Sequence, residues 1–439
     1  MPHELDKILI SASGPEWHEK IREIHAKVKR ATYFEDGSEE DNQLNEILRK
    51  VRERRGANSA IVDYTNRFDK VQLTPQQFRI SEADLEKAHT EINKELLESI
   101  QQAIKNVRKY QTEIFIGNKK ENKHPRIKYT SIKRIGICVP GASAPLPSTV
   151  VMTAVPAQVA GVEEIAIVSP PRYNGSIHPV ILAVCYELGI EEVYRIGGAQ
   201  AVAALAYGTQ TIKPVNKIVG PGNQWVQMAK RKVFGVVDID SIAGPSGVLI
   251  IADGRANPAW IAADMLSQVE HAPGSGFVFT DSQKLADEVL EELKKQVNQL
   301  DRAEETIKCL KYFGGIVVFV NIDEVITQAN FFAAEHLEIQ CGEESRDIAD
   351  KIENAGAIFI GDYSPVAVGD YWAGPSHTLP TGMTAKFFSA LSANDFIKST
   401  SIIEYDQKKL AESAEDIIRL AEIEGLDAHA KSVKIRQQS

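Results

Sequence analysis

Short apolar runs alternate with helical segments from residue 135 onward, and this alternation restricts the possible fold more than any other feature of the chain. The runs are apolar throughout, as in strands that are buried on both faces, and each precedes a stretch with helical periodicity. Strands are expected at residues 135–139, 165–168, 192–196 and 217–219. Strands of this kind, separated by helices, predict a parallel sheet with helices on both faces.

A second series of the same kind begins near residue 247. Its strands are expected at residues 247–252, 276–280, 315–320 and 357–360. The predicted fold class is therefore α/β, with two Rossmann-like parallel-sheet domains plus small N- and C-terminal extensions. The Gly-x-Gly-x-x-Gly fingerprint of dinucleotide-binding turns occurs nowhere in the sequence, so that motif does not support the assignment.

Changes in composition divide this α/β chain into four expected regions. The N-terminal arm carries a short strand near residues 8–10 and a helix from about Pro15, and it could pack on a partner subunit or fray. The helical segment before residue 133 is expected to complete the later α/β domain. The C-terminal extension is expected to be helical, with a short strand at 432–436. The four regions are 1–30, 31–132 with 247–385, 133–246, and 386–439.

Composition excludes several classes of protein. A length of 439 residues predicts two or more domains. With 50 Lys and Arg against 60 Asp and Glu, the net charge is −10, which argues against a general binder of nucleic acid or of anionic membranes. The four cysteines are widely spaced, which predicts a reducing, cytoplasmic setting and no disulfide framework. No apolar run is long enough to span a bilayer, and no signal peptide is expected.

Glycine-rich turns join strands to helices in the first α/β series. Residues 197–201 and 220–224 each follow a strand and open a helix, and residues 139–148 form a third such loop. Backbone N–H groups at such helix starts suit the phosphates of a nucleotide. Each turn taken singly could need glycine for backbone reasons alone. Two of them in one parallel sheet favour a nucleotide cleft.

An imidazole and a carboxamide lie three residues apart near the end of a predicted helix over residues 258–271. Gln268 and His271 therefore share a helix face, and each side chain can take one position on a divalent metal. A histidine near a helix end is also commonly a cap or a satisfied core residue. The pair is a plausible half-site that needs further ligands from elsewhere.

Three further stretches carry groups for acid–base or metal chemistry. Glu335 and His336 are adjacent, and at a helix end or turn both could reach one cleft, where a histidine is the natural proton acceptor. The alternative is a purely structural role at a helix C-terminus, where the helix dipole favours a histidine. The loop at residues 369–377 and the segment at 422–429 each contain an acid and a histidine, although Gly425 alone would explain the latter as a capped helix end.

Seven motifs, in this order over about residues 30 to 436, resemble the histidinol dehydrogenase family. The motifs are Gly197–Ala201, Val219–Asn223, Ala243–Ser246, Ser267–His271, Ala334–Glu338, Gly369–Tyr371 and Glu424–His429. An ordered set of seven is far more specific than any one of them. The resemblance implies an NAD-dependent alcohol and aldehyde dehydrogenase of histidine biosynthesis that uses zinc.

The resemblance also assigns roles to individual residues. It implies His336 as general base and Glu335 as the group that activates water. One zinc ion per subunit would be held by Gln268, His271, Asp370 and His429. The implied substrate contacts are Ser246, Gln268, His271, His336, Asp370, Glu424 and His429. The implied NAD contacts are Cys138, Gln200 and Asn223. In this family the C-terminal tail is expected to come from the partner subunit, which implies a homodimer with shared active sites.

The implied reaction is a four-electron oxidation of L-histidinol through an aldehyde to L-histidine, with two NAD reduced in turn. A base removes the alcohol proton as hydride leaves, and the aldehyde is hydrated before the second hydride leaves. Zinc would grip the imidazole and amino group of the substrate.

Three positions depart from the family pattern: Cys138 replaces a frequent Tyr, and Gly247 and Val366 each replace a usual Glu. Fewer carboxylates would suit an anionic substrate. The first alternative is therefore a related NAD- and zinc-dependent dehydrogenase of another small polyol or amino alcohol, such as a sulfonated diol. A nucleotide-binding protein without turnover is a second alternative, against which the retention of Glu335 and His336 speaks.

Overall fold

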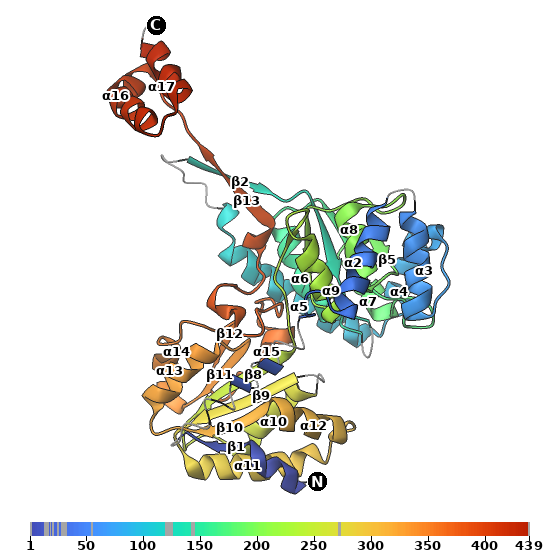
Figure 1. Cartoon of the computed structure of the whole chain (residues 1–439). Coiled ribbons are helices and arrows are strands. Elements are labelled where there is room, and N and C mark those ends of the chain that lie inside the picture. Colours follow the sequence, from blue (N-terminus) through green and yellow to red (C-terminus); the bar gives the residue numbers. More distant parts are fainter. Residues whose placement is uncertain are drawn as a thin grey trace. The chain divides into compact units, whose positions relative to one another are not determined.

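The computed structural model describes residues 2–12, 17, 19, 22–23, 26–27, 33–53, 56–118, 126–141, 145–270 and 274–437. The chain divides into two compact units. Unit 1 comprises Met1–Ile116 and Ser131–Phe396 and contains two parallel sheets, whereas unit 2 comprises Gly117–Thr130 and Ile397–Ser439. Figure 1 labels the elements of both units.

The first sheet has five strands in the order β5-β4-β3-β6-β7, and its pairs are parallel. The strands are β3 (Arg134–Cys138), β4 (Glu164–Val168), β5 (Glu192–Tyr194), β6 (Lys217–Val219) and β7 (Asp238–Ile239). The helices between them are α6 (Pro147–Val159), α7 (Pro179–Glu187), α8 (Gly198–Tyr207) and α9 (Gln224–Val233). This alternation confirms the first predicted α/β series and its Rossmann-like strand order.

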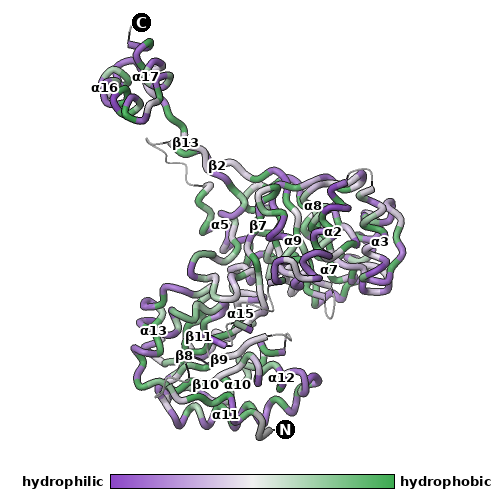
Figure 2. Tube along the Cα trace, in the orientation of Figure 1, coloured by the Kyte–Doolittle hydropathy of each residue, from purple (hydrophilic) through white to green (hydrophobic). Residues whose placement is uncertain are grey.

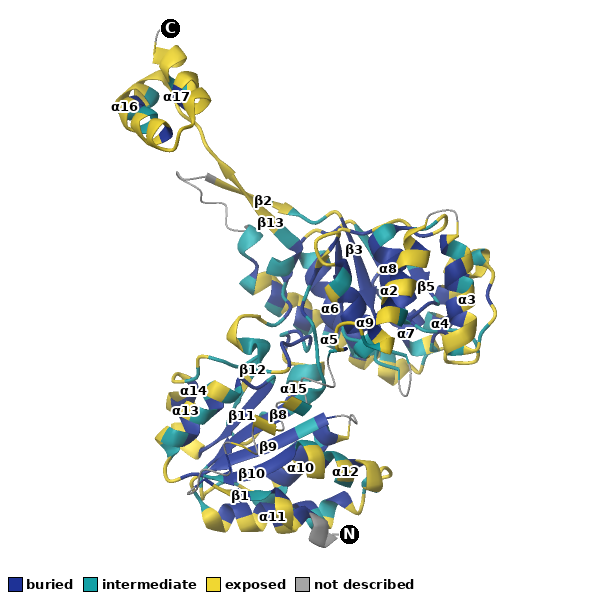
Figure 3. Cartoon of the chain, in the orientation of Figure 1, coloured by how far each residue is buried: buried dark blue, intermediate teal, exposed yellow. Residues whose placement is uncertain are grey.

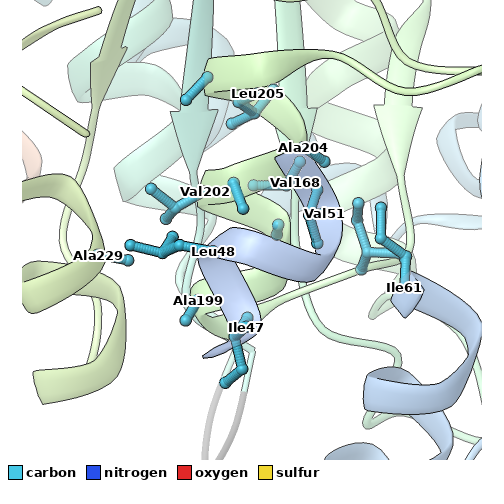
Figure 4. Close-up of a cluster of buried hydrophobic side chains, with 14 of the residues drawn as sticks. Ile47, Leu48, Val51, Ile61, Val168, Ala199, Val202, Ala204, Leu205 and Ala229 are labelled. Atoms are coloured by element: carbon cyan, nitrogen blue, oxygen red, sulfur yellow. The ribbon is translucent and has the colours of Figure 1, made fainter. Parts of the chain in front are cut away.

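The helices that precede this sheet pack on it, which corrects the expected grouping of residues 31–132 with 247–385. They are α2 (Glu39–Arg52), α3 (Ala57–Asp69), α4 (Glu82–Glu91) and α5 (Lys94–Ile114). Helix α2 directs Ile47, Leu48 and Val51 toward α8 (Figure 4). Helix α8 is rich in alanine, so α2 can approach its backbone closely, and α4 and α5 pack on α7 and α6.

The second sheet has six parallel strands in the order β1-β10-β9-β8-β11-β12. The strands are β1 (Leu9–Ser11), β8 (Ser246–Ala252), β9 (Gly274–Thr280), β10 (Gly314–Val318), β11 (His336–Gln340) and β12 (Ala357–Ile360). Its helices are α10 (Pro258–Val269), α11 (Gln283–Val297), α12 (Ala303–Phe313), α13 (Ile322–Phe332), α14 (Ser345–Ala349) and α15 (Val366–Tyr371). The predicted fold class is therefore confirmed.

Both faces of the second sheet are buried (Figure 3). Val248 and Ile250 of β8 belong to one apolar cluster, and the alternate residues Leu249 and Ile251 belong to another on the opposite face. The predicted strand in the N-terminal arm forms as β1, where Leu9 pairs with Ile316 at the sheet edge. This strand therefore extends the chain's own sheet, while Pro15, the expected start of the next helix, lies outside the described residues.

Unit 2 consists of a two-stranded sheet of β2 (Arg126–Ser131) and β13 (Ile397–Ile402) and of helices α16 (Gln407–Ile423) and α17 (Asp427–Lys434). The boundary expected at residue 386 thus lies at Ile397, and the unit also takes in residues 117–130. The predicted terminal strand at 432–436 is wrong, because α17 continues through Lys434 into a 3-10 turn. Both helices mix hydrophilic and hydrophobic residues along their length (Figure 2).

The remaining short elements are 3-10 turns. They span Pro2–Ile8, Pro75–Gln77, Ile116–Asn118, Gly342–Glu344, Thr384–Lys386, Ala393–Phe396 and Ile435–Gln437. Across the part of the chain that the structure describes, no helix combines the length and apolar character needed to cross a membrane.

Candidate active site

Glu335 and His336 lie at the amino-terminal edge of the second sheet. Helix α13 ends at Ala333 in a left-handed conformation (φ 50°), Glu335 occupies the following turn, and His336 is the first residue of β11. The turn lets two adjacent side chains reach one place, as the sequence predicts for a helix end. Ligand sites of open parallel sheets usually lie at the carboxyl edge, so the amino-edge position departs from that rule.

Gly247 connects the two residues through its backbone. Its N–H donates to Glu335 Oε2 (2.7 Å), and its carbonyl oxygen lies 3.1 Å from His336 Nδ1. A carbonyl oxygen can only accept, so Nδ1 carries the proton and Nε2 is left as the basic nitrogen. Gly247 was singled out only as a departure from the family pattern, and a Cβ at this position would lie 2.1 Å from Ser275 Oγ.

The His336 Nε2 atom is buried and has no hydrogen-bond partner. It lies 3.7 Å from Asp370 Oδ1 of α15. Burial lowers the pKa of His336, but the carboxylates of Glu335 and Asp370 outweigh it, so the net shift is upward. Both His336 and Asp370 line a cavity of about 330 Å³ that also reaches His377. Nε2 is therefore placed to take a proton from a bound molecule.

Ser246 and Gln268 complete this cluster. Ser246 Oγ donates to Gln268 Oε1 (2.9 Å), and Gln268 is buried near the end of α10. Burial raises the pKa of Glu335, while His336, the Gly247 N–H and the Ser246 hydroxyl act in the opposite direction. The structure thus brings together five of the predicted site residues: Ser246, Gln268, Glu335, His336 and Asp370.

The other predicted metal and substrate residues are not part of this cluster. His271 lies outside the described residues. Glu424 and His429 belong to unit 2, where both are exposed. Among the residues that the structure describes, no three His, Cys, Asp or Glu side chains gather as a metal site. Gln268 and Asp370 nevertheless offer an amide and a carboxylate oxygen at the edges of this cluster, and both are oxygen donors that zinc accepts.

The three predicted NAD contacts meet in a second cavity, of about 370 Å³, at the carboxyl edge of the five-stranded sheet. Cys138 ends β3, Gln200 lies in the first turn of α8, and Asn223 caps α9 by accepting from Val226 N (3.2 Å). Gln200 is buried, yet neither its oxygen nor its nitrogen has a partner. An unsatisfied amide in a cleft between helix starts suits a nucleotide.

The turn that carries Asn223 is held by a buried ion pair that sequence reasoning missed. Asp240 Oδ2 accepts from Gly220 N (2.7 Å), and Lys230 Nζ donates to Gly220 O (3.0 Å) and contacts Asp240. Burial raises the pKa of the Cys138 thiol to about 12, so this cysteine is an inert wall of the cleft. Gln227 of α9 also accepts from Ala243 N (2.9 Å), which ties this cleft to the segment leading to Ser246.

A Rossmann-like cleft at one sheet and a buried acid–imidazole pair at the other are features that fit an α/β oxidoreductase. The family model described as histidinol dehydrogenase matches residues 30–437, and the chain belongs to this family. It is thus an oxidoreductase of histidine biosynthesis that acts on a small molecule, which confirms the predicted family and enzyme class.

Relatives are similar over most of their length. The histidinol dehydrogenase of Rhodopirellula baltica is 47% identical over 383 residues, which cover 86% of this chain and 83% of that protein. The one from Geobacillus kaustophilus is 42% identical over 423 residues, covering 95% and 99%. The crystal structure of histidinol dehydrogenase from Elizabethkingia anophelis is similar with a TM-score of 0.89 and 33% identity, and the match covers 98% of each chain.

Proposed function

We propose that this chain oxidises L-histidinol to L-histidine through histidinal, in two successive two-electron steps that reduce two NAD and require zinc. The observation that carries the proposal is the arrangement at His336. Its Nδ1 proton is held by Gly247 O (3.1 Å), so the unpartnered Nε2 faces the cavity as a base. A general base of this kind accelerates alcohol oxidation by accepting the hydroxyl proton.

The chain's own groups account for both halves of the reaction. In the first, His336 Nε2 takes the proton of the substrate hydroxyl while hydride leaves its carbon. In the second, Glu335 activates the water that hydrates the aldehyde, and its position beside the Gly247 N–H (2.7 Å) and His336 fixes its orientation. NAD, when bound near Gln200 and Asn223, would accept the hydride in each half.

The proposed zinc ligands are Gln268, His271, Asp370 and His429, with one ion per subunit. Gln268 and Asp370 flank the Ser246–Glu335–His336 cluster, so an ion between them would adjoin the base. Bound zinc would hold the imidazole and amino group of the substrate and orient the reacting carbon. Ser246 and Glu424 are proposed as further substrate contacts.

We also propose a homodimer in which Glu424 and His429 complete the partner's site. Unit 2 supports this proposal because it exposes large apolar side chains, including Leu420 at 63%, Ile423 at 83% and Ile435 at 65%. Such surfaces mark interaction sites in proteins. The four cysteines are free, in keeping with a cytoplasmic setting, which we propose for the protein.

The alternative of an anionic substrate rests on the loss of carboxylates at Gly247 and Val366. The Val366 side chain is buried in an apolar cluster and does not line the cavity beside His336. Its replacement of a glutamate therefore does not remove a charge from that cavity. The test is NADH formation by the zinc-loaded protein with L-histidinol and, separately, with a panel of sulfonated diols. Turnover of the diols alone would overturn the proposed substrate.

A further inference from the structure

The three elements that carry Gln268, His336 and Asp370 share a second, buried point of contact. Gln340 Nε2 donates to Asp264 Oδ2 (2.9 Å) and to Glu338 Oε2 (3.1 Å). The Val366 N–H donates to Glu338 Oε1 (3.0 Å). Glu338 is 1% exposed and Gln340 3% exposed, so these bonds form in the interior of unit 1. We call Asp264, Glu338, Gln340 and the Val366 N–H the carboxyl cluster.

Each of the three elements that contribute to the carboxyl cluster also carries a site residue on the same face. Asp264 precedes Gln268 by one turn of α10, and Val366 precedes Asp370 by one turn of α15. Residues four apart on a helix share a face. Glu338 follows His336 by two positions on β11, and residues two apart on a strand point to the same side. The cluster therefore joins α10, β11 and α15 at positions one helix turn, or two strand residues, away from the residues that form the site.

The carboxyl cluster brings together two acids, Asp264 and Glu338, and a proton on one of them would remove the repulsion between two carboxylates. Within the described part of the chain, neither Asp264 nor Glu338 forms an ion pair with Lys, Arg or His. Burial and the neighbouring Asp264 raise the pKa of Glu338, and burial raises the pKa of Asp264. A proton on Glu338 fits both directions, because its O–H could then donate to the Asp264 carboxylate. Two buried acids joined in this way cost stability compared with apolar side chains of similar size.

We propose that the carboxyl cluster is a clamp that fixes Gln268, His336 and Asp370 relative to one another, so that Asp264 and Glu338 are positioning residues for the reaction. The inference rests on the proposed roles of Gln268 and Asp370 as metal ligands. An interior of leucine and valine would hold the three elements together equally well. A hydrogen-bonded cluster also sets their register, because each bond has one distance and direction.

The test compares Glu338→Leu with Glu338→Gln in the full-length protein. Glutamine keeps a donor toward Asp264 and an acceptor for the Val366 N–H and loses only the acceptor for Gln340 Nε2, whereas leucine keeps only the volume. Leucine should weaken zinc binding, measured by competition with a chelator, about 10- to 100-fold, the usual effect of losing an outer-shell partner. The kcat should fall similarly, while NAD binding stays close to wild type and Tm falls only as far as the unsatisfied Val366 N–H and Gln340 amide require. Glutamine should restore zinc affinity and kcat to within about threefold.

A second pair of variants removes one bond of the clamp without touching a carboxyl group. Val366 is the first residue of α15 after Pro365, a position that tolerates proline. Val366→Pro deletes the N–H donor, and Val366→Ala keeps it while also shortening the side chain. The proline variant should weaken zinc binding, and the alanine variant should not. A matched control, Thr280→Val, removes a buried hydroxyl that accepts from Ser282 N (3.0 Å) at the carboxyl end of β9, the opposite edge of the sheet from His336, and should leave zinc affinity unchanged.

Two results would overturn the clamp. One is a Glu338→Leu protein with a lowered Tm but with wild-type zinc affinity and kcat per folded molecule, because Glu338 would then contribute only to the stability of the fold. The other is a Glu338→Gln protein as impaired as Glu338→Leu. Amide hydrogen exchange separates the clamp from the proposed function, because Glu338→Leu should speed exchange of the Val366 N–H whether or not the wild type binds zinc or oxidises histidinol.

Discussion

His336 Nε2 and Asp370 Oδ1 lie 3.7 Å apart, beyond hydrogen-bond distance, although the imidazole is 3% exposed. The nitrogen has no hydrogen-bond partner, so a buried base and a carboxylate lie side by side in the wall of one cavity. This relationship separates two roles within a few ångströms. His336 is proposed to accept a proton, and Asp370 is proposed to hold the metal.

Replacing His336 with Asn tests that separation. The variant should retain zinc, because His336 is not among the proposed ligands, while kcat falls by about 10²- to 10⁴-fold, the range for a lost general base. Zinc content by mass spectrometry of the native protein and steady-state NADH formation measure the two effects. Loss of zinc together with activity would contradict the separation of base from ligand.

A substitution at Gly220 tests whether the turn before α9 belongs to the proposed NAD site. It adopts φ +105°, and a Cβ there would lie 2.3 Å from Cys138 O. Gly220→Ala should weaken NAD binding at least about tenfold and destabilise the fold by about 1–3 kcal/mol or more, since both strain and a backbone clash arise. Calorimetric titration with NAD and thermal unfolding measure these changes.

The matched control for this variant is Gly235→Ala. Gly235 has a similar φ of +96° but open space around its Cβ position. It should show the cost of backbone strain without the loss of NAD affinity. Equal NAD affinities in the two alanine variants would exclude the turn at Gly220 from the cofactor site.

The proposal that the two subunits share their active sites predicts the activity of mixed dimers. His429→Ala and His336→Asn homodimers should each be nearly inactive. A heterodimer of the two should regain one intact site when the tail of one subunit completes the site of the other, giving about half of wild-type activity per site-bearing dimer. Purified, doubly tagged heterodimers provide the measurement. Absence of rescue in such dimers would place His429 in the site of its own subunit.

The carboxyl cluster predicts how stability depends on pH. Glu338 faces Asp264 from α10 and the Val366 N–H from α15, and His336 precedes it on β11. Because burial raises its folded pKa, the folded state binds more protons than the unfolded state above the ordinary pKa of Glu, about 4.3. Wild-type stability should therefore fall with rising pH relative to Glu338→Gln, by at most about 1.4 kcal/mol per pH unit.

Urea unfolding of both proteins between pH 5 and 8, in the same buffer series, measures this difference. The sign follows from the direction of proton binding: an acid that is harder to ionise when folded makes the folded state less favourable as pH rises. If the stability of wild type minus that of Glu338→Gln stayed constant across the range, or rose with pH, Glu338 would be ionised in the folded protein.

The fold was predictable where burial is continuous along the sequence. Most strands of the two sheets are apolar runs, such as Val248–Ala252, and these were predicted from the sequence. The polar strand β11 and the two-residue strand β7 were not predicted. The placement of α2 was not predictable, because its apolar face fits either sheet and the choice depends on the alanine-rich surface of α8. Strand β1 shows the same limit, since Leu9–Ser11 acquires its partner, β10, only through long-range pairing.

The site was predictable through motifs more than through local chemistry. The adjacent Glu335 and His336 signal a cleft, but only the structure shows that Gly247 links them and frees Nε2. Glu338 carried a usable signal, an acid inside a strand that is otherwise buried, which sequence reasoning passed over. The Asp240 carboxylate gave no such signal, because its partner Lys230 is ten residues away on another element.

The most direct measurement of the central claim is the amount of NADH formed per L-histidinol consumed by the zinc-loaded protein. The proposed function predicts two NADH for each histidinol, with L-histidine as the product and no accumulation of histidinal. One NADH per histidinol, with the aldehyde as the final product, would contradict the four-electron reaction and the role of Glu335 in the second step.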